Sequence, residues 1–437
     1  LGGGFHRYST DRFWRIPHFE KMLYDNALLA KLYIDMAQAT KQELYNTVPR
    51  GIFDYILREM TSPEGVFYSG QDADTEGEEG RYYFWAMKEF LDLLGPRYAK
   101  VMARHFGVTS AGHMAQKNVL YINESMESVA KLEKIAIFEI DHIFRTSRIA
   151  LLEAREKRVR PLTDAKIITG WNGLMITAFA SGYMVLHGKS YLDAATRAAE
   201  FLWTNMWAES GCLLRIYNDG ENKINGFLED YAYFLEGMIS LYEASLDILW
   251  IERAKHLADK MIDEFYDDKE GGFFMTGISS ERLIVRLKNA GDEAIPSANA
   301  IAIQSILKLG YLTGNNTYIA TAEVIRLVGA TPIFVDIAHD TFNMNPELIP
   351  KAIQFAKNKG LDPKAIIPVD LFGLPADYEK IEEVANENNL LLLEDAAQGF
   401  GGSIKGRKAG SFGNVAATSF FPAKPLGCYG DGGAIFT

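Results

Sequence analysis

Cysteine is scarce in this chain, with two residues among 437. Cys212 and Cys428 lie far apart, so a disulfide framework is excluded and both are expected to be thiols in a reducing compartment. No run of about 18 apolar residues is present, which argues against a membrane-spanning helix. There is no charged and then apolar leader either, although the chain opens with Leu1 rather than Met. We therefore expect a cytoplasmic protein without a membrane partner.

Basic residues are also fewer than acidic ones. The chain has 45 Lys and Arg and 57 Asp and Glu, which gives a formal net charge of −12. Nucleic-acid binders need a basic face to neutralise phosphates, so nucleic acid is not an expected partner. The apolar share of 48% and the charged share of 23% are those of an ordinary globular protein. At roughly 150 residues per domain, the length allows two or three domains.

Up to about residue 316, apolar residues recur with the period of amphipathic helices. One predicted stripe is Leu28, Leu32 and Met36, and another is Ala254, Leu257, Met261 and Phe265. The helices come in pairs that start near residues 174, 228 and 297, a spacing that predicts stacked helical hairpins closing into a toroid. An aromatic, glycine-rich loop at 266–274 is expected to form a short β-hairpin at one rim.

Five motifs identify this region further: Gly3–Trp14, Pro17–Asn26, Asp72–Gly77, Thr169–Met175 and Gly226–Ala232. As a set they resemble the helical barrel of the large thioredoxin-domain-containing proteins of the spermatogenesis-associated protein 20-like family. That barrel is similar to the N-acylglucosamine 2-epimerase and six-hairpin glycosidase folds. The resemblance implies an incomplete α/α toroid over residues 1–316, which begins inside the barrel and leaves it one hairpin early. Because the chain has no Cys-x-x-Cys, we do not expect it to contain the family's thioredoxin domain.

Epimerases of this shape use histidines as general acid and base, and glycosidases use paired carboxylates. By resemblance, we expect a sugar as the small-molecule partner of a site at the barrel mouth. His18 and Glu229 are its candidate catalytic residues, and the candidate substrate-binding residues are His6, Trp14, Trp171 and Asp230.

Structural alternatives stay open for these residues. Glu229 and Asp230 open a predicted helix, where the macrodipole stabilises acids. His18 lies between Pro17 and Phe19 and is equally compatible with a buried, hydrogen-bonded histidine. The tryptophans are also explained by core packing. No metal site is predicted, because the nearby acids Asp72 and Asp74 have no partners at ligand spacing.

After Gly329 the pattern changes to short apolar strands that alternate with helices. Strands are predicted at 332–335, 365–369, 390–393, 415–420 and 433–436, with helices at 346–360 and 377–388. Such an alternation indicates a mostly parallel, buried sheet. Ligands of these sheets lie at the carboxyl ends of the strands, where Asp395 and Ser419 fall.

Lys424 follows a predicted strand and precedes a glycine-rich turn. A lysine amine can form a Schiff base with an aldehyde cofactor, and a strand-end carboxylate can keep a pyridine nitrogen protonated. Together Asp395, Gln398, Ser419 and Lys424 resemble the cofactor site of the DegT/StrS-type nucleotide-sugar aminotransferases. As isolated residues, a strand-end Asp is often a turn former and a lone Lys is usually solvated.

This second resemblance implies pyridoxal phosphate as the cofactor and a nucleotide sugar as the substrate. Lys424 corresponds to the catalytic Schiff-base lysine, Asp395 to the partner of the pyridine nitrogen, Gln398 to a neighbour of the ring hydroxyl and Ser419 to a phosphate ligand. Tyr318 corresponds to the aromatic that stacks on the cofactor ring. The complete enzymes of this family are expected to be homodimers.

The sequence thus predicts a multidomain chain: a partial α/α barrel over 1–316 and a partial aminotransferase-like α/β domain over 317–437. A helix at 319–327 is shared, and no proline- or glycine-rich linker separates the parts, unlike in ordinary tandem domains. We expect a join between two truncated genes or an assembly artefact, with a purposeful fusion as the weaker alternative. Because the family's upstream phosphate loop and its small domain are absent, the C-terminal part is expected to be inactive as it stands. The alternative function is an epimerase-like protein or a sugar-binding scaffold without catalysis.

Overall fold

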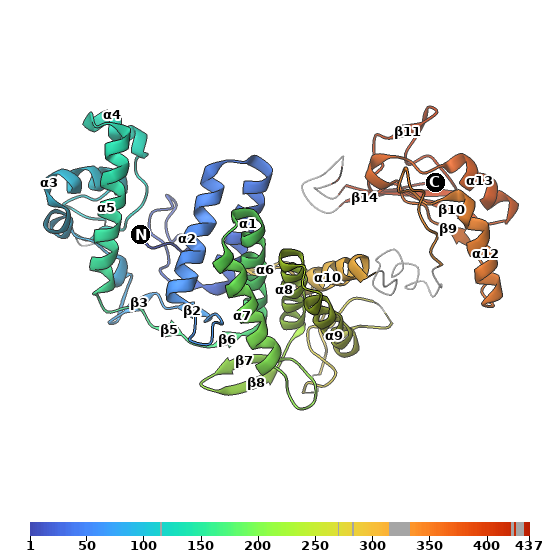
Figure 1. Cartoon of the computed structure of the whole chain (residues 1–437), viewed down its shortest axis with the longest axis horizontal. Coiled ribbons are helices and arrows are strands. Elements are labelled where there is room, and N and C mark those ends of the chain that lie inside the picture. The colour runs from blue at the N-terminus through green and yellow to red at the C-terminus, as the bar shows by residue number, and fades with distance from the viewer. Residues whose placement is uncertain (114–115, 270, 282–283, 314–332, 421–423, 425–431) are drawn as a thin grey trace. The chain divides into compact units, whose positions relative to one another are not determined.

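The computed structural model describes residues 1–437 except 114–115, 270, 282–283, 314–332, 421–423 and 425–431. The chain forms two compact units, Leu1–Ala320 and Thr321–Thr437, which Figure 1 draws together and which are described separately below. The predicted boundary at 316/317 and the predicted helix 319–327 lie outside the described residues. Of the described helices, none has the length and apolar character that a membrane span requires.

Four helices of the first unit pack side by side in chain order: α1 (Leu23–Thr40), α6 (Thr169–Leu186), α8 (Leu228–Ser245) and α10 (Ala298–Thr313). We call them the inner helices. The first three are each followed by a helix that packs against them: α2 (Glu43–Glu59), α7 (Lys189–Asn205) and α9 (Ile248–Phe265) (Figure 1). The predicted succession of helical hairpins is therefore confirmed, and the inner helices begin close to the expected residues.

The inner helices α6 and α8 approach each other very closely. A Cβ on Gly173 would lie 2.5 Å from the carbonyl carbon of Tyr233, and a Cβ on Gly237 would lie 3.1 Å from the carbonyl oxygen of Gly173. Only glycine fits this contact, because a side chain would push the backbones apart. Both helices are buried on most of their surface, since each has a neighbour on more than one side.

The predicted stripes differ in how well they match the observed burial. All four residues of the predicted stripe on α9 are buried. The stripe on α1 is wrong, because Leu32 is 55% exposed while small residues such as Ala27 and Ala30 are buried. The inner helix α1 contacts both α2 and α6, so close backbone packing by alanines replaces a single leucine stripe.

Short strands lie directly before the inner helices. The strand β1 (Lys21–Met22) precedes α1 and pairs with β2 (Gly70–Gln71), which also pairs with β5 (Thr163–Asp164). A second small sheet precedes α6 and α8 and contains β6 (Ile167–Ile168), β7 (Leu214–Asn218) and β8 (Glu221–Asn225). An antiparallel bridge between Tyr266 and Phe273 confirms the predicted hairpin. These strands therefore mark the end of the inner helices where their N-termini lie, which we call the rim (Figure 1).

Three further helices of the first unit have an apolar cluster of their own: α3 (Met87–Phe106), α4 (Met126–Glu133) and α5 (Ile137–Glu156). Trp85 and Phe90 are buried in this cluster with their rings edge to face. The hairpin β3 (Asp74–Thr75) and β4 (Glu78–Glu79) lies between α2 and α3 in the sequence.

In the second unit, four strands form one sheet in the order β14-β13-β10-β9. They are β9 (Ala365–Ile366), β10 (Leu391–Asp395), β13 (Val415–Ser419) and β14 (Gly433–Phe436). The first three are parallel and β14 is antiparallel, so the predicted mostly parallel sheet is confirmed. The helices α12 (Ile349–Asn358) and α13 (Tyr378–Glu387) share an apolar cluster with Ile366 and Leu392 of the sheet. A small hairpin, β11 (Ser403–Ile404) and β12 (Arg407–Lys408), separates β10 from β13 in the sequence.

The strand predicted at 332–335 is wrong for its described residues, 333–335, which form no strand. The chain instead makes an isolated antiparallel bridge between Ile337 and Met344. Among the described residues, no strand pairs with the outer edge of β9, so the apolar run has no ladder to join. Val335 still packs against the apolar cluster of this unit.

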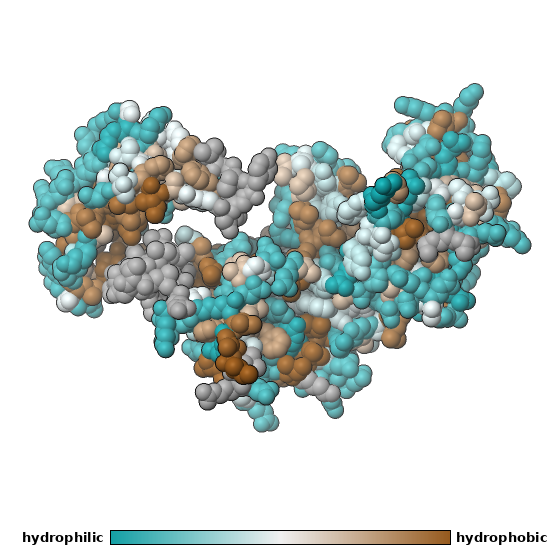
Figure 2. Space-filling model, turned by 180° about the vertical axis from the view of Figure 1, so that it is seen from behind, coloured by the Kyte–Doolittle hydropathy of each residue, from teal (hydrophilic) through white to brown (hydrophobic). Residues whose placement is uncertain are grey.

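The face drawn in Figure 2 is largely hydrophilic, with apolar patches between the polar side chains. Some large apolar side chains are exposed because of their position in the backbone. Leu246, for example, is 77% exposed as the C-cap of α8, where its φ of 59° turns it away from the helix. Singly exposed apolar residues of this kind are ordinary in folded proteins.

Candidate functional site

The carboxyl ends of β10 and β13 bring two predicted site residues to one edge of the sheet. Asp395 is the last residue of β10 and Ser419 is the last residue of β13. The strands are parallel, with Asp395 opposite Ala417. The pairing continues past β10, because Ala396 N donates to Ala417 O at 2.8 Å. Both side chains are half-buried.

The carboxylate of Asp395 has one hydrogen bond from the described residues, in which Ala397 N donates to Oδ1 at 3.1 Å. Asp395 therefore forms the turn expected of a strand-end Asp, and this turn uses only one of its two carboxylate oxygens. Gln398 follows in the same turn, and its Oε1 accepts a hydrogen bond from Phe372 N at 3.1 Å. The amide of Gln398 therefore joins this turn to the segment after Asp370.

Lys424 is half-buried and follows β13, but its neighbours 421–423 and 425–431 are outside the described residues. Tyr318 also lies outside them. The roles given to Lys424 and Tyr318 therefore stay predictions.

Behind Asp395 lies a pair of buried carboxyl groups that we did not predict, Asp370 and Glu394, both 0% exposed. Oδ1 of Asp370 accepts hydrogen bonds from the hydroxyl of Tyr378 at 2.7 Å and from Ala376 N at 3.1 Å. Oδ2 is buried and has no hydrogen-bond donor among the described residues. Burial raises the pKa of Asp370 above its ordinary value.

Glu394 accepts hydrogen bonds from Gly410 N at 2.6 Å and from Phe412 N at 2.8 Å. Burial raises its pKa to about 7, and its interaction with Asp370 raises it as well. Since two carboxylates cannot share a dry site when both are charged, one proton between Asp370 and Glu394 is the arrangement that satisfies Oδ2. The sequence signal was the double acid Glu394-Asp395, whose side chains point to opposite faces of the strand.

At the rim of the first unit, the N-terminal segment lies beside the first turns of α1 and α6. The rings of Trp171 and Tyr24 meet edge to face at 4.8 Å, and the Arg7 guanidinium lies 5.9 Å from the Tyr24 ring. Arg7 also pairs with Glu20 at 3.1 Å. Trp14 does not share in this contact: it is 83% exposed, on a loop whose turn is held by Asp11.

Asp25 is the unsatisfied acid of the rim. It lies in the first turn of α1, and its buried Oδ2 has no hydrogen-bond partner among the described residues. Burial raises the pKa of this carboxyl to about 6, while Arg7 acts in the opposite direction.

The two predicted histidines have different partners. His18 places Nδ1 2.8 Å from Glu79 and Nε2 3.6 Å from Glu20, so it is not a core histidine. His6 has Nδ1 2.9 Å from the carbonyl oxygen of Phe19 and meets the Tyr83 ring edge to face at 4.7 Å. Burial holds the pKa of His6 well below its ordinary value, which keeps the ring neutral.

Asp230 lies at the start of α8 and is fully buried. Oδ1 accepts a hydrogen bond from Gly170 N at 2.9 Å, and Oδ2 accepts from Phe227 N at 2.9 Å and from Arg215 at 2.8 Å. Burial raises its pKa to about 6 despite the Arg215 charge. Glu229 pairs with the same guanidinium at 2.6 Å. The helix-start role is therefore present, and Glu229 is the more accessible of the two acids, with a side chain 17% exposed.

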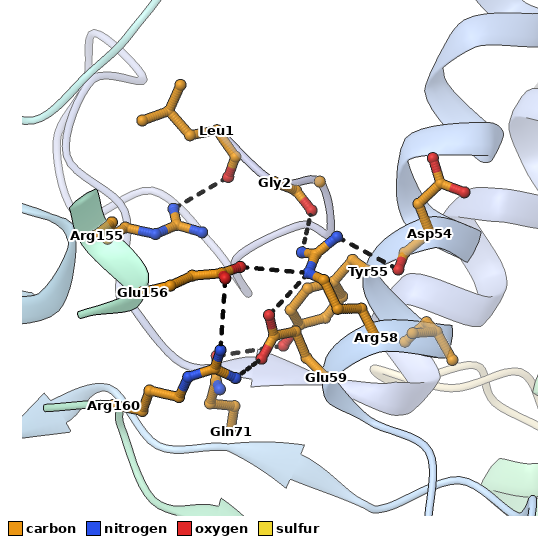
Figure 3. A network of polar contacts seen from close by, with 12 residues as sticks. Leu1, Gly2, Asp54, Tyr55, Arg58, Glu59, Gln71, Arg155, Glu156 and Arg160 are labelled. Atoms are coloured by element: carbon orange, nitrogen blue, oxygen red, sulfur yellow. Dashed lines mark hydrogen bonds and ion pairs between the residues drawn. The ribbon is translucent and has the colours of Figure 1, made fainter. Parts of the chain in front are cut away.

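A polar network fixes the N-terminal segment to α2 and α5, as Figure 3 shows. Arg58 donates to the carbonyl of Gly2 at 2.7 Å and pairs with Glu59 at 2.9 Å and Glu156 at 3.8 Å. Arg160 contacts the same two carboxylates at 2.5 and 3.9 Å. Because Arg58 and Arg160 are both paired with Glu59 and Glu156, we interpret this network as the support of the rim rather than as a binding site.

Comparison with known proteins finds different relatives for the N-terminal and the C-terminal regions. Residues 297–437 match the model of the DegT/DnrJ/EryC1/StrS aminotransferase family. UDP-2-acetamido-2-deoxy-3-oxo-D-glucuronate aminotransferase of Pseudomonas aeruginosa is 50% identical over 126 residues, which cover 29% of this chain and 33% of that enzyme. Human spermatogenesis-associated protein 20 matches the N-terminal region and is 35% identical over 353 residues, which cover 73% of this chain and 45% of the human protein.

The chain joins regions similar to two different families. Both predicted resemblances are confirmed. The chain spans less than half of the human relative and about a third of the bacterial enzyme. The structure of cellobiose 2-epimerase from Bacillus thermoamylovorans aligns with 94% of this chain and 84% of its own, with a TM-score of 0.47 and 11% identity.

Proposed function

We propose that the second unit is a pyridoxal-phosphate-binding unit of the kind used in nucleotide-sugar aminotransferases. Aminotransferases of the matched family depend on pyridoxal phosphate, and the relatives act on nucleotide sugars. The observation that carries the proposal is the pair of neighbouring parallel strands that end at Asp395 and Ser419. Since only part of such an enzyme aligns with this chain, both binding and activity belong to the proposal.

The described residues fit this cofactor. The hydrogen bond from Ala397 N uses only Oδ1 of Asp395. The other carboxylate oxygen would keep the pyridine nitrogen protonated. Because Oε1 of Gln398 already accepts from Phe372, its amide nitrogen is the group that would donate to the ring hydroxyl oxygen. Ser419 would donate to the phosphate, and Lys424 would attach the cofactor through its amine. When bound, pyridoxal phosphate supplies the electron sink for amino-group transfer. The stacking role of Tyr318, which lies outside the described residues, stays a prediction from the resemblance.

The test adds pyridoxal phosphate to the full chain, reduces the mixture with borohydride and maps pyridoxyl groups by mass spectrometry. We expect a visible absorbance band and a label on Lys424. Lys424→Arg should remove both, whereas Lys364→Arg, at an exposed lysine of the same unit, should leave them unchanged. Asp395→Asn should shift the absorbance maximum while the label persists. A folded chain labelled only at random lysines would refute the proposal.

A second proposal concerns the rim, where an aromatic pair lies beside an unsatisfied acid. The half-buried Trp171, which packs edge to face on the buried Tyr24, offers a ring of the kind that stacks on sugars, and Asp25 offers a buried acceptor. We infer a carbohydrate-binding role for the rim, with His18 and Glu229 as the candidate acid and base, and with His6 and Trp14 as candidate contacts. Trp171→Ala should abolish binding of glucose or cellobiose, followed by NMR, and Tyr311→Ala at an exposed ring of α10 should not. Equal binding by both variants would refute it.

A further inference from the structure

The opposite end of the inner helices contains a polar cavity. Its volume is about 250 Å³, and its lining comes from α1, α6, α8 and α10. Thr177 and Glu236 each lie eight residues beyond the first residue of their helix (177 − 169 and 236 − 228), which is about 12 Å along the axis at about 1.5 Å per residue. The cavity is therefore distinct from the rim.

One hydroxyl group of this cavity lacks the hydrogen-bond partner that burial requires. Thr177 is 5% exposed, and its Oγ1 has no hydrogen-bond partner among the described residues. Ser181, Ser240 and Ser305 line the same space and are also buried. A buried hydroxyl without a partner costs about 1–3 kcal/mol, so hydroxyls from three helices around one cavity indicate that something polar occupies it.

The charged side chains that line the cavity carry a net negative charge. Lys31 pairs with Asp35 at 2.7 Å, and Lys308 pairs with Glu243 at 2.7 Å. The carboxylate of Glu236 also lines the cavity, and no described residue gives it a hydrogen bond or an ion pair. Burial raises the pKa of Glu236, whereas the charges of Lys31 and Lys308 act in the opposite direction.

We propose that this cavity binds a small hydroxylated amine, such as an amino sugar with a free amino group. The ligand's hydroxyls would pair with Thr177 and the serines, and its ammonium would pair with Glu236. Two lysines stand against three carboxylates in the lining, so a phosphate or carboxylate ligand would meet net repulsion. The cavity volume suits one monosaccharide ring rather than an oligosaccharide or a nucleotide sugar.

The experiment titrates the full chain with D-glucosamine, D-glucose and N-acetyl-D-glucosamine and follows binding by calorimetry and ligand-observed NMR. We expect D-glucosamine to bind about tenfold more tightly than the two uncharged sugars. Glu236→Gln should remove that preference and leave the affinity for D-glucose unchanged. Glu252→Gln, at an exposed carboxylate of α9, should bind all three sugars like the parent chain.

Thr177→Val tests the hydroxyl contacts separately, since it keeps the side-chain shape. This variant should weaken the binding of all three sugars by the same factor and leave the far-UV circular dichroism of the protein unchanged. Three outcomes overturn the proposal: no binding of any sugar, a preference for D-glucosamine that survives Glu236→Gln, or the same loss in Glu252→Gln. If water alone fills the cavity, Thr177→Val raises the stability and no sugar binds.

Discussion

Oδ1 of Asp230 accepts a hydrogen bond from Gly170 N at 2.9 Å, and this bond joins the first turn of α8 to the first turn of α6. The other oxygen bonds Phe227 N and Arg215, so one buried carboxylate satisfies three donors. The close contact of α6 and α8 begins at this point, where a Cβ on Gly170 would lie 3.1 Å from Oδ1. The rim geometry therefore depends on Asp230 even if no ligand touches it.

Replacing Asp230 should destabilise the helical unit more than replacing its neighbour. Asp230→Ala leaves the buried Gly170 N and Phe227 N without an acceptor and removes one of the two carboxylates that pair with Arg215, and we expect a loss of about 3–5 kcal/mol in the free energy of unfolding. Glu229→Ala removes a partly accessible carboxylate of the same ion pair and should cost about 1 kcal/mol. All six tryptophans belong to this unit, so urea unfolding followed by tryptophan fluorescence reports on it alone. Equal losses in the two variants would contradict the structural role of Asp230.

Glycine at position 3 is required by contact as well as by conformation. Gly3 has φ +80°, and a Cβ there would lie 1.9 Å from the carbonyl oxygen of Gly51 on α2. Gly77 has φ +76° with no atom within 4 Å of its Cβ position, so Gly77→Ala isolates the backbone strain, about 1–2 kcal/mol. Gly3→Ala should lose clearly more than this in the same fluorescence assay. If Gly3→Ala lowers the free energy of unfolding no more than Gly77→Ala does, then α2 can shift away from the new Cβ at no measurable cost.

Asp25 should make the stability of the helical unit depend on pH. Its pKa is raised to about 6 by burial, so the folded state favours the protonated carboxyl. The stabilisation from this group is complete below pH 4 and is lost as the pH rises through 6. Asp25→Asn should therefore raise Tm at pH 8 and change it little at pH 4. Asp35→Asn, at an exposed acid of the same helix, is the control; the same Tm gain there would show that net charge is responsible.

The sequence predicted the helical hairpins well where one face of a helix is buried. On α9 the whole predicted apolar stripe lies on the buried face, which also includes Trp250, Ile251 and Ala258, because this helix packs mainly against α8. On α1 it failed, since alanines fill the contacts of an inner helix and hydropathy does not distinguish them from surface alanines. The strand predicted at 332–335 failed for a related reason: apolar residues alone do not supply a neighbouring strand.

For the candidate sites, the sequence was informative where a residue's position follows from its immediate neighbours in the chain. Asp395 and Ser419 were placed correctly at strand ends because both follow short apolar runs. Asp370 was not predicted, since its contact with Glu394 exists only after β9 and β10 have paired. The cavity at Thr177 and Glu236 was also missed, because polar residues at helical spacing have the pattern of a solvated face. Sequence thus indicates which groups are present, and pairing of distant elements decides which of them meet.

The buried carboxyl pair of the second unit gives the sharpest pH prediction. Because burial raises the pKa of Asp370 and brings that of Glu394 to about 7, the unit is most stable when the pair holds its proton, and stability falls as the pH rises through 7. Asp370→Asn keeps the acceptor for Tyr378 and Ala376 and places an amide donor at the position of Oδ2, where it can bond ionised Glu394. We expect this variant to be the more stable protein at pH 8 and to lose most of the pH dependence between pH 5 and 8. Hydrogen exchange of peptides from 365–420, read by mass spectrometry, measures the effect in this unit, and Asp362→Asn at an exposed ion pair with Lys364 is the matched control. If Asp370→Asn retains the full pH dependence, the two carboxyl groups titrate independently and no proton is shared between them.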